Sequence, residues 1–171
     1  MAERALDPQQ LGDHLDRLYR AAWGLCGSRE EAEDLVQDTY ARVLSKPRML
    51  RNDDDLGYLL RVMRNTFISR HRTAERRPKT EPFAEGADPA DLRPELRPDA
   101  ALEARDVFGA IAALPDDFRD ALVAVDVAGL SYREAGKLLK TKEATITSRL
   151  HRARKQVAEL LGQESTREGV I

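Results

Sequence analysis

The side chains best suited to catalysis or metal binding in this sequence do not form a catalytic pattern. The three histidines, His14, His71 and His151, are scattered, and none lies in an H-E-x-x-H motif. Cys26 is the single cysteine, so it has no partner for an intrachain disulfide or a cysteine-rich zinc site. Glycine-rich phosphate loops and G-x-S-x-G motifs are also missing. We therefore expect no catalytic residues, no bound metal and no cofactor, and a hydrolase would lack a nucleophile and a base.

The charged residues are instead sorted into blocks that suit binding. The overall net charge is only -2, but residues 61–79 contain seven basic residues and one acidic residue. Residues 131–155 contain eight basic and two acidic residues, whereas residues 30–38 contain five acidic residues and no basic one. This distribution indicates DNA binding at two places and a basic protein partner at a third.

Apolar periodicity predicts helices to carry these blocks. Apolar residues recur at steps of three and four through residues 11–25, 32–44 and 56–67, with Leu15 and Leu44 among those expected on the inner faces. The same spacing returns between residues 102 and 160. The fold class is therefore predicted to be all-α, with one small helical domain over residues 7–73 and a second over residues 101–162.

The segment between the two domains differs in composition. Residues 74–100 contain five prolines, few large apolar residues and no periodicity, which predicts a flexible, proline-rich linker. Residues 163–171 are predicted to be a disordered tail. Within the second domain, Ser131-x-x-Glu134 is a capping box that opens a short helix, although Gly136 inside it costs up to about 1 kcal/mol relative to alanine. A short helix, a tight turn and a longer basic helix form a helix-turn-helix pattern.

The last helix carries the stronger DNA-binding signal. If Ile146, Leu150 and Ala153 face inward, the outer and flanking faces carry Lys142, Glu143, Thr145, Thr147, Ser148, Arg149 and Arg152. Arginine binds guanine or phosphate with two hydrogen bonds, and hydroxyl side chains reach base edges. On composition alone an ordinary solvated basic face would be equally probable. The preceding capped helix favours DNA.

A second cationic stripe lies opposite the apolar face of the helix predicted over residues 56–67. It contains Arg61, Arg64, Asn65, Ile68 and Arg72, with Tyr58 and the loop of residues 46–55 beside it. Cations next to an aromatic ring and an amide suit single-stranded or melted DNA. Taken alone, this stripe fits better with a surface helix whose arginine stems cover apolar neighbours.

Three motifs resemble those of extracytoplasmic-function (ECF) RNA polymerase sigma factors. Residues 31–40 (EAEDLVQDTY) resemble the region 2.2 helix, which in that family binds the clamp coiled-coil of the largest polymerase subunit. Residues 58–65 (YLLRVMRN) resemble the region 2.3 to 2.4 segment, which opens and reads the minus-10 element. Leu114-Pro115, residues 129–135 (GLSYREA) and residues 145–154 (TITSRLHRAR) resemble region 4, which reads the minus-35 element.

The resemblance implies a role for particular side chains. The residues implied to bind polymerase are Glu31, Glu33, Asp34, Gln37 and Asp38. Those implied to bind minus-10 DNA are Tyr58, Arg61, Arg64, Asn65 and Arg72. Those implied to bind minus-35 DNA are Lys142, Thr145, Thr147, Ser148, Arg149 and Arg152. Departures from the family pattern include Tyr58 where tryptophan is usual and Lys140 where the turn usually has glycine.

The resemblance implies a sigma factor that binds core RNA polymerase, reads both promoter elements and assists DNA melting, without being an enzyme. Its partners would be polymerase, promoter DNA and an anti-sigma protein, and the free chain is expected to be a monomer. The first predicted helix starts too soon after Met1 to leave room for a secretory signal, and no apolar run approaches the roughly 20 residues of a membrane span, so we expect a cytoplasmic protein without membrane insertion.

Two alternatives remain open. An ordinary helix-turn-helix regulator would explain the second domain but not the acidic helix or the stripe between Arg61 and Arg72. A sigma-factor mimic that sequesters an anti-sigma protein would have little use for two basic DNA surfaces.

Overall fold

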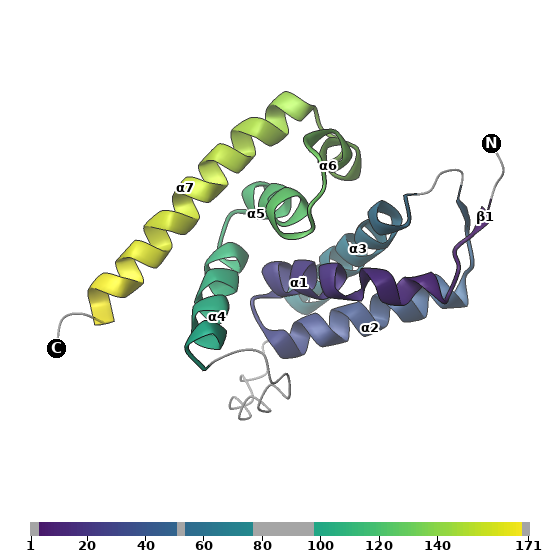
Figure 1. The fold of residues 1–171 in the computed structure, drawn as a ribbon, viewed down its shortest axis with the longest axis horizontal. Helices are drawn as coiled ribbons and strands as arrows, with labels where there is room; N and C mark the ends of the chain where they lie inside the picture. The colour runs from purple at the N-terminus through teal and green to yellow at the C-terminus, as the bar shows by residue number, and fades with distance from the viewer. Residues whose placement is uncertain (1–3, 51–53, 77–97, 169–171) are drawn as a thin grey trace.

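The structure is a computed structural model that describes residues 4–50, 54–76 and 98–168, with side chains described from residue 101 to residue 163 in the last segment. It contains two helical bundles (Figure 1). The first has a 3-10 helix, Gln10–His14, and the helices α1 (Leu15–Cys26), α2 (Arg29–Ser45) and α3 (Asp55–Arg76). The second has α4 (Pro98–Ala112), α5 (Asp116–Leu122), a π-helical turn over Val123–Val127, α6 (Tyr132–Leu139) and α7 (Glu143–Glu168).

Local sequence signals explain where α1 and α2 meet. Gly27 follows α1 with a φ of 77°, a left-handed conformation that glycine adopts without a steric penalty. Ser28 then caps α2, since its hydroxyl accepts a hydrogen bond from the Glu31 backbone N–H at 3.3 Å. The chain therefore reverses direction between two helices that pack against each other.

The first bundle also contains a short two-stranded ribbon that the sequence did not predict. Strand β1 (Arg4–Ala5) pairs antiparallel with β2 (Met49–Leu50), so the start of the described chain is joined to the loop before α3. The Arg4 guanidinium lies 2.6 Å from a carboxylate oxygen of Asp55, a residue that is itself buried. Two-residue strands carry little periodicity, which is why the pattern of the sequence does not reveal them.

The second bundle confirms the predicted helix-turn-helix pattern. Both hydrogen bonds of the capping box are present at the start of α6: the Ser131 hydroxyl accepts from the Glu134 N–H, and the Glu134 carboxylate accepts from the Ser131 N–H at 2.8 Å. The second bond lowers the pKa of Glu134 below its usual range. Lys140 ends α6 with a φ of 54°, the left-handed conformation that glycine usually supplies at this position.

Close packing explains the glycine at position 136, although glycine is a poor helix former. A Cβ atom at this position would lie 2.8 Å from the backbone oxygen of Thr141, in the turn between α6 and α7. The Thr141 N–H also donates to the Gly136 carbonyl at 2.9 Å. The glycine therefore lets the turn fold back closely onto α6.

The two bundles share one hydrophobic core. Helix α1 packs on α4, α5 and the π-helical turn, and α3 contacts α6. The Trp23 and Phe108 rings stack across this boundary, with their centroids 4.3 Å apart. The sequence predicted each bundle but not this contact between them.

Several predicted boundaries and faces differ from the structure. Leu15 and Leu44 were expected inside, but 44% and 51% of their surfaces are exposed. Helix α3 continues to Arg76 and α4 begins at Pro98, so both extend into the predicted linker. The remaining part of that linker, residues 77–97, lies outside the described residues. Helix α7 extends to Glu168, past the predicted end of the second domain at residue 162.

Candidate polymerase and nucleic-acid interfaces

The acidic residues expected to bind polymerase lie on the outer side of α2. Glu31, Glu33, Asp34 and Gln37 are exposed, whereas Asp38 is partly buried. The Asp38 carboxylate accepts a hydrogen bond from Arg70 of α3 at 3.2 Å and lies 3.5 Å from Arg42. Four of the five predicted side chains are thus available to a basic partner, while Asp38 already has cationic partners within the bundle.

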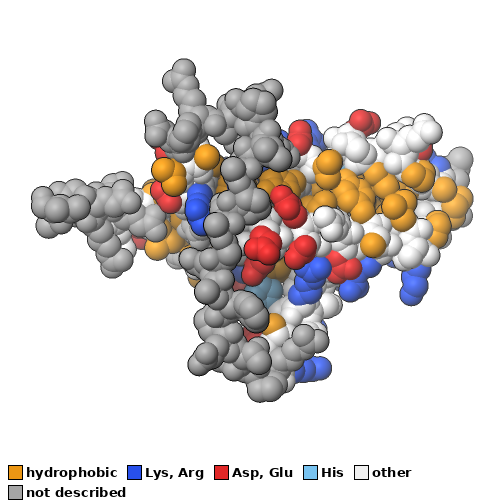
Figure 2. Space-filling model, turned by 90° about the horizontal axis from the view of Figure 1, so that it is seen from below, with side chains coloured by type: hydrophobic (Ala, Val, Ile, Leu, Met, Phe, Trp, Pro, Cys, Tyr) orange, Lys and Arg blue, Asp and Glu red, His pale blue; other side chains and the backbone are white. Residues whose placement is uncertain are grey.

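Exposed apolar side chains add to this part of the first bundle. Leu44 near the end of α2 and Met49 in β2 expose 51% and 52% of their surfaces. Figure 2 shows hydrophobic side chains in a band along one face of the molecule, bordered by acidic and basic groups. Sequence reasoning missed Leu44 as a surface candidate because it assigned this residue to the core from its spacing, and it made no prediction for Met49. Large exposed apolar groups at the edge of a charged surface are typical of protein contacts.

Four of the residues expected to bind minus-10 DNA share one stripe of α3. Tyr58, Arg61, Asn65 and Arg72 follow each other at steps of three, four and seven, which places them on the same face of a helix. Arg61, Asn65 and Arg72 are exposed, and Tyr58 is half-buried against the core. Leu59, Met63 and Phe67 point to the opposite side and are buried. The helix therefore holds a rigid cationic edge with an amide and a phenol ring.

A cavity of about 490 Å³ lies at the Tyr58 end of this stripe. Its lining includes three cationic side chains, Arg42, Lys46 and Arg48, together with Tyr58 and Val62. Val43, Ser45 and Pro47 complete it. The cavity joins the end of α2 and the loop before β2 to the first turns of α3, so it combines an aromatic ring with cations. The cations from the end of α2 and its following loop were not among the predicted site residues.

Arg64, the fifth predicted minus-10 residue, is placed differently. Its guanidinium donates from Nε to Oδ2 of Asp120 in α5 at 3.0 Å, and the Asp120 side chain is only 7% exposed. This ion pair directs Arg64 toward the second bundle, whereas Arg61 and Asn65 are exposed. The structure therefore does not bring Arg64 together with the other four.

The helix-turn-helix forms a basic groove of about 970 Å³. The groove is lined by residues of α6, the turn and the start of α7: Arg133, Gly136, Lys137, Lys140, Thr141, Lys142, Glu143 and Thr145. Only Lys142 and Thr145 of these were predicted to touch DNA. The other cations belong to the basic block of residues 131–155, so the charge distribution contained a signal for them that the choice of α7 alone left out.

The remaining predicted residues of α7 divide between two faces. Thr145, Ser148 and Arg152 follow one stripe at steps of three and four, next to the groove. Thr147 lies on the other flank, where its hydroxyl donates to the Glu143 carbonyl at 3.1 Å. Arg149 is partly covered and lies 3.2 Å from the carboxylate of Asp117 in α5. We therefore find Ser148 and Arg152 free on the outer face, and Arg149 in contact with its own domain.

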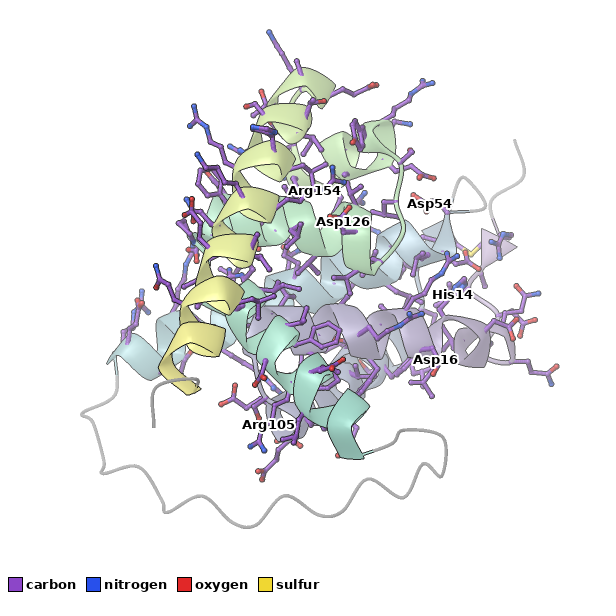
Figure 3. All side chains as sticks on the ribbon, turned by 60° about the vertical axis from the view of Figure 1, so that its left-hand side comes forward. His14, Asp16, Asp54, Arg105, Asp126 and Arg154 are labelled. Atoms are coloured by element: carbon purple, nitrogen blue, oxygen red, sulfur yellow. The ribbon has the colours of Figure 1, made fainter. Side chains whose placement is uncertain are left out.

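A second ion pair anchors α7 in the bundle. Arg154 points at Asp126 of the π-helical turn (Figure 3), and two of its nitrogens donate to the two carboxylate oxygens at 2.8 and 2.7 Å. These hydrogen bonds raise the pKa of Arg154 above its usual value. A bidentate pair of this kind fixes direction as well as distance, so it orients the helix that carries Ser148 and Arg152.

The part of the chain with described residues shows neither a metal site nor a membrane span. It contains no group of three or more His, Cys, Asp or Glu side chains that could hold a metal ion. None of its helices has the length and apolar character needed to cross a bilayer.

Two helical bundles, one ending in a helix-turn-helix and the other carrying a cationic helix beside an acidic one, define a class of DNA-binding transcription proteins. Comparison with known families agrees with this class. Residues 11–77 match sigma-70 region 2, and residues 104–157 match sigma-70 region 4. The chain belongs to the ECF RNA polymerase sigma factors, which direct promoter-specific transcription initiation. This result confirms the predicted family and the prediction that the chain is not an enzyme.

Individual relatives support the same assignment. The chain is 38% identical over 157 residues to the ECF sigma factor SigE of Mycolicibacterium smegmatis, covering 90% of this chain and 60% of that protein. It is 34% identical to the ECF sigma factor EcfG of Rhodopseudomonas palustris, covering 82% and 76% of the two chains. Its fold is similar to that of the sigma factor RpoE of Bartonella quintana, solved in complex with the anti-sigma factor NepR, with a TM-score of 0.66, 26% identity and coverage of 90% and 95%.

Proposed function

We propose that this chain binds core RNA polymerase through α2 and reads a promoter at two separate places. The observation that carries the proposal is the presence of two basic surfaces on two different bundles. One is a helix edge next to an aromatic cavity, and the other is a helix-turn-helix groove. Nucleotide addition would belong to polymerase, so no catalytic group is required in this chain.

The acidic face of α2 is the proposed polymerase contact. Glu31, Glu33, Asp34 and Gln37 would meet a basic helical surface on the largest subunit, and Asp38 would keep its partners in α3 and α2. Exposed Leu44 and Met49 would add apolar contact area. Charged rims of this kind set orientation and the rate of encounter, while buried apolar groups supply much of the affinity.

The α3 edge is the proposed contact with the melted minus-10 element. Arg61 and Arg72 would bind the backbone of the separated strand, and Asn65 would hydrogen-bond to a base. Tyr58 borders a cavity in which an extruded base could stack on the ring while Arg42, Lys46 or Arg48 holds its phosphate. Such contacts form only after the duplex opens, so they would return part of the few kcal/mol that unstacking a base costs.

The groove between α6 and α7 is the proposed contact with the minus-35 duplex. Ser148 and Arg152 would face base edges in the major groove, with Lys142 and Thr145 at the start of α7. Arg133, Lys137 and Lys140 would bind phosphates and set the register. Arg149 would take part only after leaving Asp117, or else it positions α7 without touching DNA.

The experiment that tests this assignment separates DNA opening from DNA binding. Tyr58→Ala and Asn65→Ala should bind the upstream duplex as tightly as the wild type, because neither residue lies in the second bundle. Both variants should reduce run-off transcription from fully paired promoters, and a pre-melted minus-10 bubble should restore much of it. Permanganate footprinting of exposed thymines reports the opening directly.

A matched control comes from the same helix. Ala74→Ser changes an exposed residue of α3 on the side opposite the predicted stripe and should open promoters normally. If the Tyr58 and Asn65 variants open paired DNA as well as this control does, α3 is a structural surface and its proposed role is wrong.

We also propose an anti-sigma protein as a partner, supported by the NepR complex of the Bartonella relative. The free chain would be a monomer, and it would act in the cytoplasm, where polymerase and promoters are found. Co-expression with a candidate anti-sigma protein, followed by size-exclusion chromatography, tests the first two points.

A further inference from the structure

Strand β1 is joined to both of the chain segments that form the cavity beside Tyr58. Its backbone pairs with β2, which directly follows the loop on one side of the cavity. Its Arg4 side chain reaches Asp55, 51 positions further along the chain, in the first turn of α3 on the other side. Figure 1 shows the ribbon at the end of the first bundle where α3 begins. One short segment therefore holds two parts of the site that are separate in sequence.

The loop on the first side depends on β2 for its position. Lys46, Pro47 and Arg48 line the cavity, and they connect α2 to β2 without belonging to either element. Helix α2 holds the start of this loop, and the pairing of β2 with β1 holds its end. A two-residue ribbon is weak by itself, so side chains must keep it in place. Leu6 after β1 packs against the hydrophobic core and Leu50 in β2 is buried, which fixes the ribbon to the bundle.

The first turn of α3 is fixed on the second side by two aspartates. The Asp54 carboxylate accepts a hydrogen bond from the Gly57 N–H at 2.9 Å, and the Asp54 carbonyl accepts one from the Tyr58 N–H at 3.2 Å. A Cβ atom on Gly57 would collide with the Asp54 carboxylate, so glycine leaves room for this cap. The next residue, Asp55, is buried, with its carboxylate 2.6 Å from Arg4. A buried carboxylate needs a compensating charge, so Arg4 helps to hold the turn that precedes Tyr58.

We propose that residues 4–6 form a strap that positions this cavity for a separated DNA strand, and that Arg4 is a positioning residue for capture of the strand. Arg4 acts on both sides of the cavity, through its backbone on the cationic loop and through its side chain on the start of α3. Its guanidinium is engaged with Asp55, so its effect on the strand is indirect. This inference rests on the proposed function, because it takes the cavity to receive an extruded base and its phosphate.

The physical reason is that a preformed cavity captures a base at a lower cost than one that must be assembled. If the strap is released, the cationic side chains of the loop and the Tyr58 ring have to be ordered when the strand binds. Ordering one or two side chains corresponds to a loss of affinity of about threefold to tenfold. Promoter opening should fall as well, because contacts with the separated strand compensate the cost of unstacking its bases.

The test uses the full chain bound to core polymerase, with a promoter that the wild type transcribes. Arg4→Ala removes the tie to Asp55, whereas Arg4→Lys keeps a positive charge at that position. Arg17→Ala is the matched control, because it removes an exposed arginine of α1 that does not line the cavity. Run-off transcription is compared on paired and pre-melted templates. Fluorescence anisotropy measures the binding of a labelled single strand that carries the minus-10 sequence of the same promoter.

We expect Arg4→Ala to bind the single strand about threefold to tenfold more weakly than the wild type. Transcription should fall on the paired template, and the pre-melted template should restore much of it. Arg4→Lys should recover part of the loss, and Arg17→Ala should behave as the wild type does. Affinity for core polymerase should stay close to the wild-type value, because the acidic residues of that proposed interface lie on α2 itself.

A second variant separates positioning from stability. Arg4→Ala alone leaves the buried Asp55 carboxylate without this partner, which is costly for folding. Combining Arg4→Ala with Asp55→Asn removes the unpaired charge but does not restore the tie between β1 and α3. The Tm of the double variant should therefore recover relative to Arg4→Ala, while the defect on the paired template should persist.

Three results would overturn the proposal. One is an Arg4→Ala variant that opens paired DNA as well as Arg17→Ala does, and another is an equal loss of transcription on both templates. The third is a double variant in which transcription from the paired template recovers together with Tm. If Arg4→Ala opens DNA normally while Tyr58→Ala does not, the strap is rejected and the proposed role of α3 stands. If both variants open DNA normally, both proposals are rejected.

Discussion

Gly136→Ala should destabilise the protein, although alanine is the better helix former. Replacing glycine by alanine inside a helix normally stabilises it by up to about 1 kcal/mol. Here the added Cβ would lie 2.8 Å from the Thr141 backbone oxygen, and backbone cannot rotate away as a flexible side chain can. Relieving such an overlap typically costs about 1–3 kcal/mol. After the propensity gain is subtracted, we expect a net loss of up to about 2 kcal/mol.

The loss should appear both in stability and in DNA binding. For a chain of this size, 1 kcal/mol corresponds to a shift in Tm of about 2–4 °C, so Gly136→Ala should lower Tm by up to about 8 °C. The turn that Gly136 supports also sets the angle between α6 and α7, and binding to a minus-35 duplex should weaken as well. Thermal denaturation followed by circular dichroism and fluorescence anisotropy with labelled duplex measure the two effects.

Gly109→Ala should have the opposite effect and stabilise the protein. Gly109 lies inside α4, and a Cβ there would meet nothing within 4 Å. Propensity should therefore act alone and raise Tm by about 2–4 °C. If Gly136→Ala stabilised the protein as Gly109→Ala is expected to do, the close approach of the turn would not be the reason for glycine at position 136.

Three further predictions follow from the described surfaces. Glu33→Lys and Asp34→Lys should weaken binding to core polymerase without lowering Tm, because exposed charges contribute little to stability; unchanged affinity in a competition assay would remove α2 from the interface. If Arg152 contacts a guanine, Arg152→Ala should cost about 1–3 kcal/mol in minus-35 binding and relax the base preference at one position. If it contacts a phosphate, the substitution should lower the dependence of binding on salt concentration by about one unit in the log–log slope. A variant with unaltered affinity and slope would exclude both contacts. Burial, followed by the nearby Glu31 charge, raises the pKa of the Cys26 thiol to about 12. Alkylation at pH 8 should therefore be about a thousandfold slower in the folded chain than in urea. The contribution of the protonated thiol to stability should be lost as the pH rises from about 9 toward 12. Equal alkylation rates in the two states would contradict the burial of Cys26.

Local patterns were enough to predict most of the helices and the family. Periodicity indicated the helices of both bundles, and the Ser131–Glu134 box marked the start of α6 because capping needs only residues three apart. The same periodicity wrongly placed Leu15 and Leu44 in the core. They fit the apolar spacing of α1 and α2, but each lies near a helix end, where the described elements leave about half of its surface exposed. Periodicity describes the face of a helix and does not describe how far a partner extends along it.

The sequence by itself determined that the chain is helical, that it has two bundles and that its cations are concentrated in two blocks. These properties depend on residue type and on spacing within one helix. Only the tertiary structure decided which cations are free. Arg61 and Arg64 are three residues apart and looked equivalent, yet Arg61 is exposed while Arg64 is paired with an aspartate 56 positions further along the chain. Arg149 likewise meets Asp117 and Arg154 meets Asp126, whereas Arg152 remains exposed. Such pairings depend on how helices pack, because a salt bridge needs two charged groups within about 4 Å, and local spacing cannot specify that distance between separate elements.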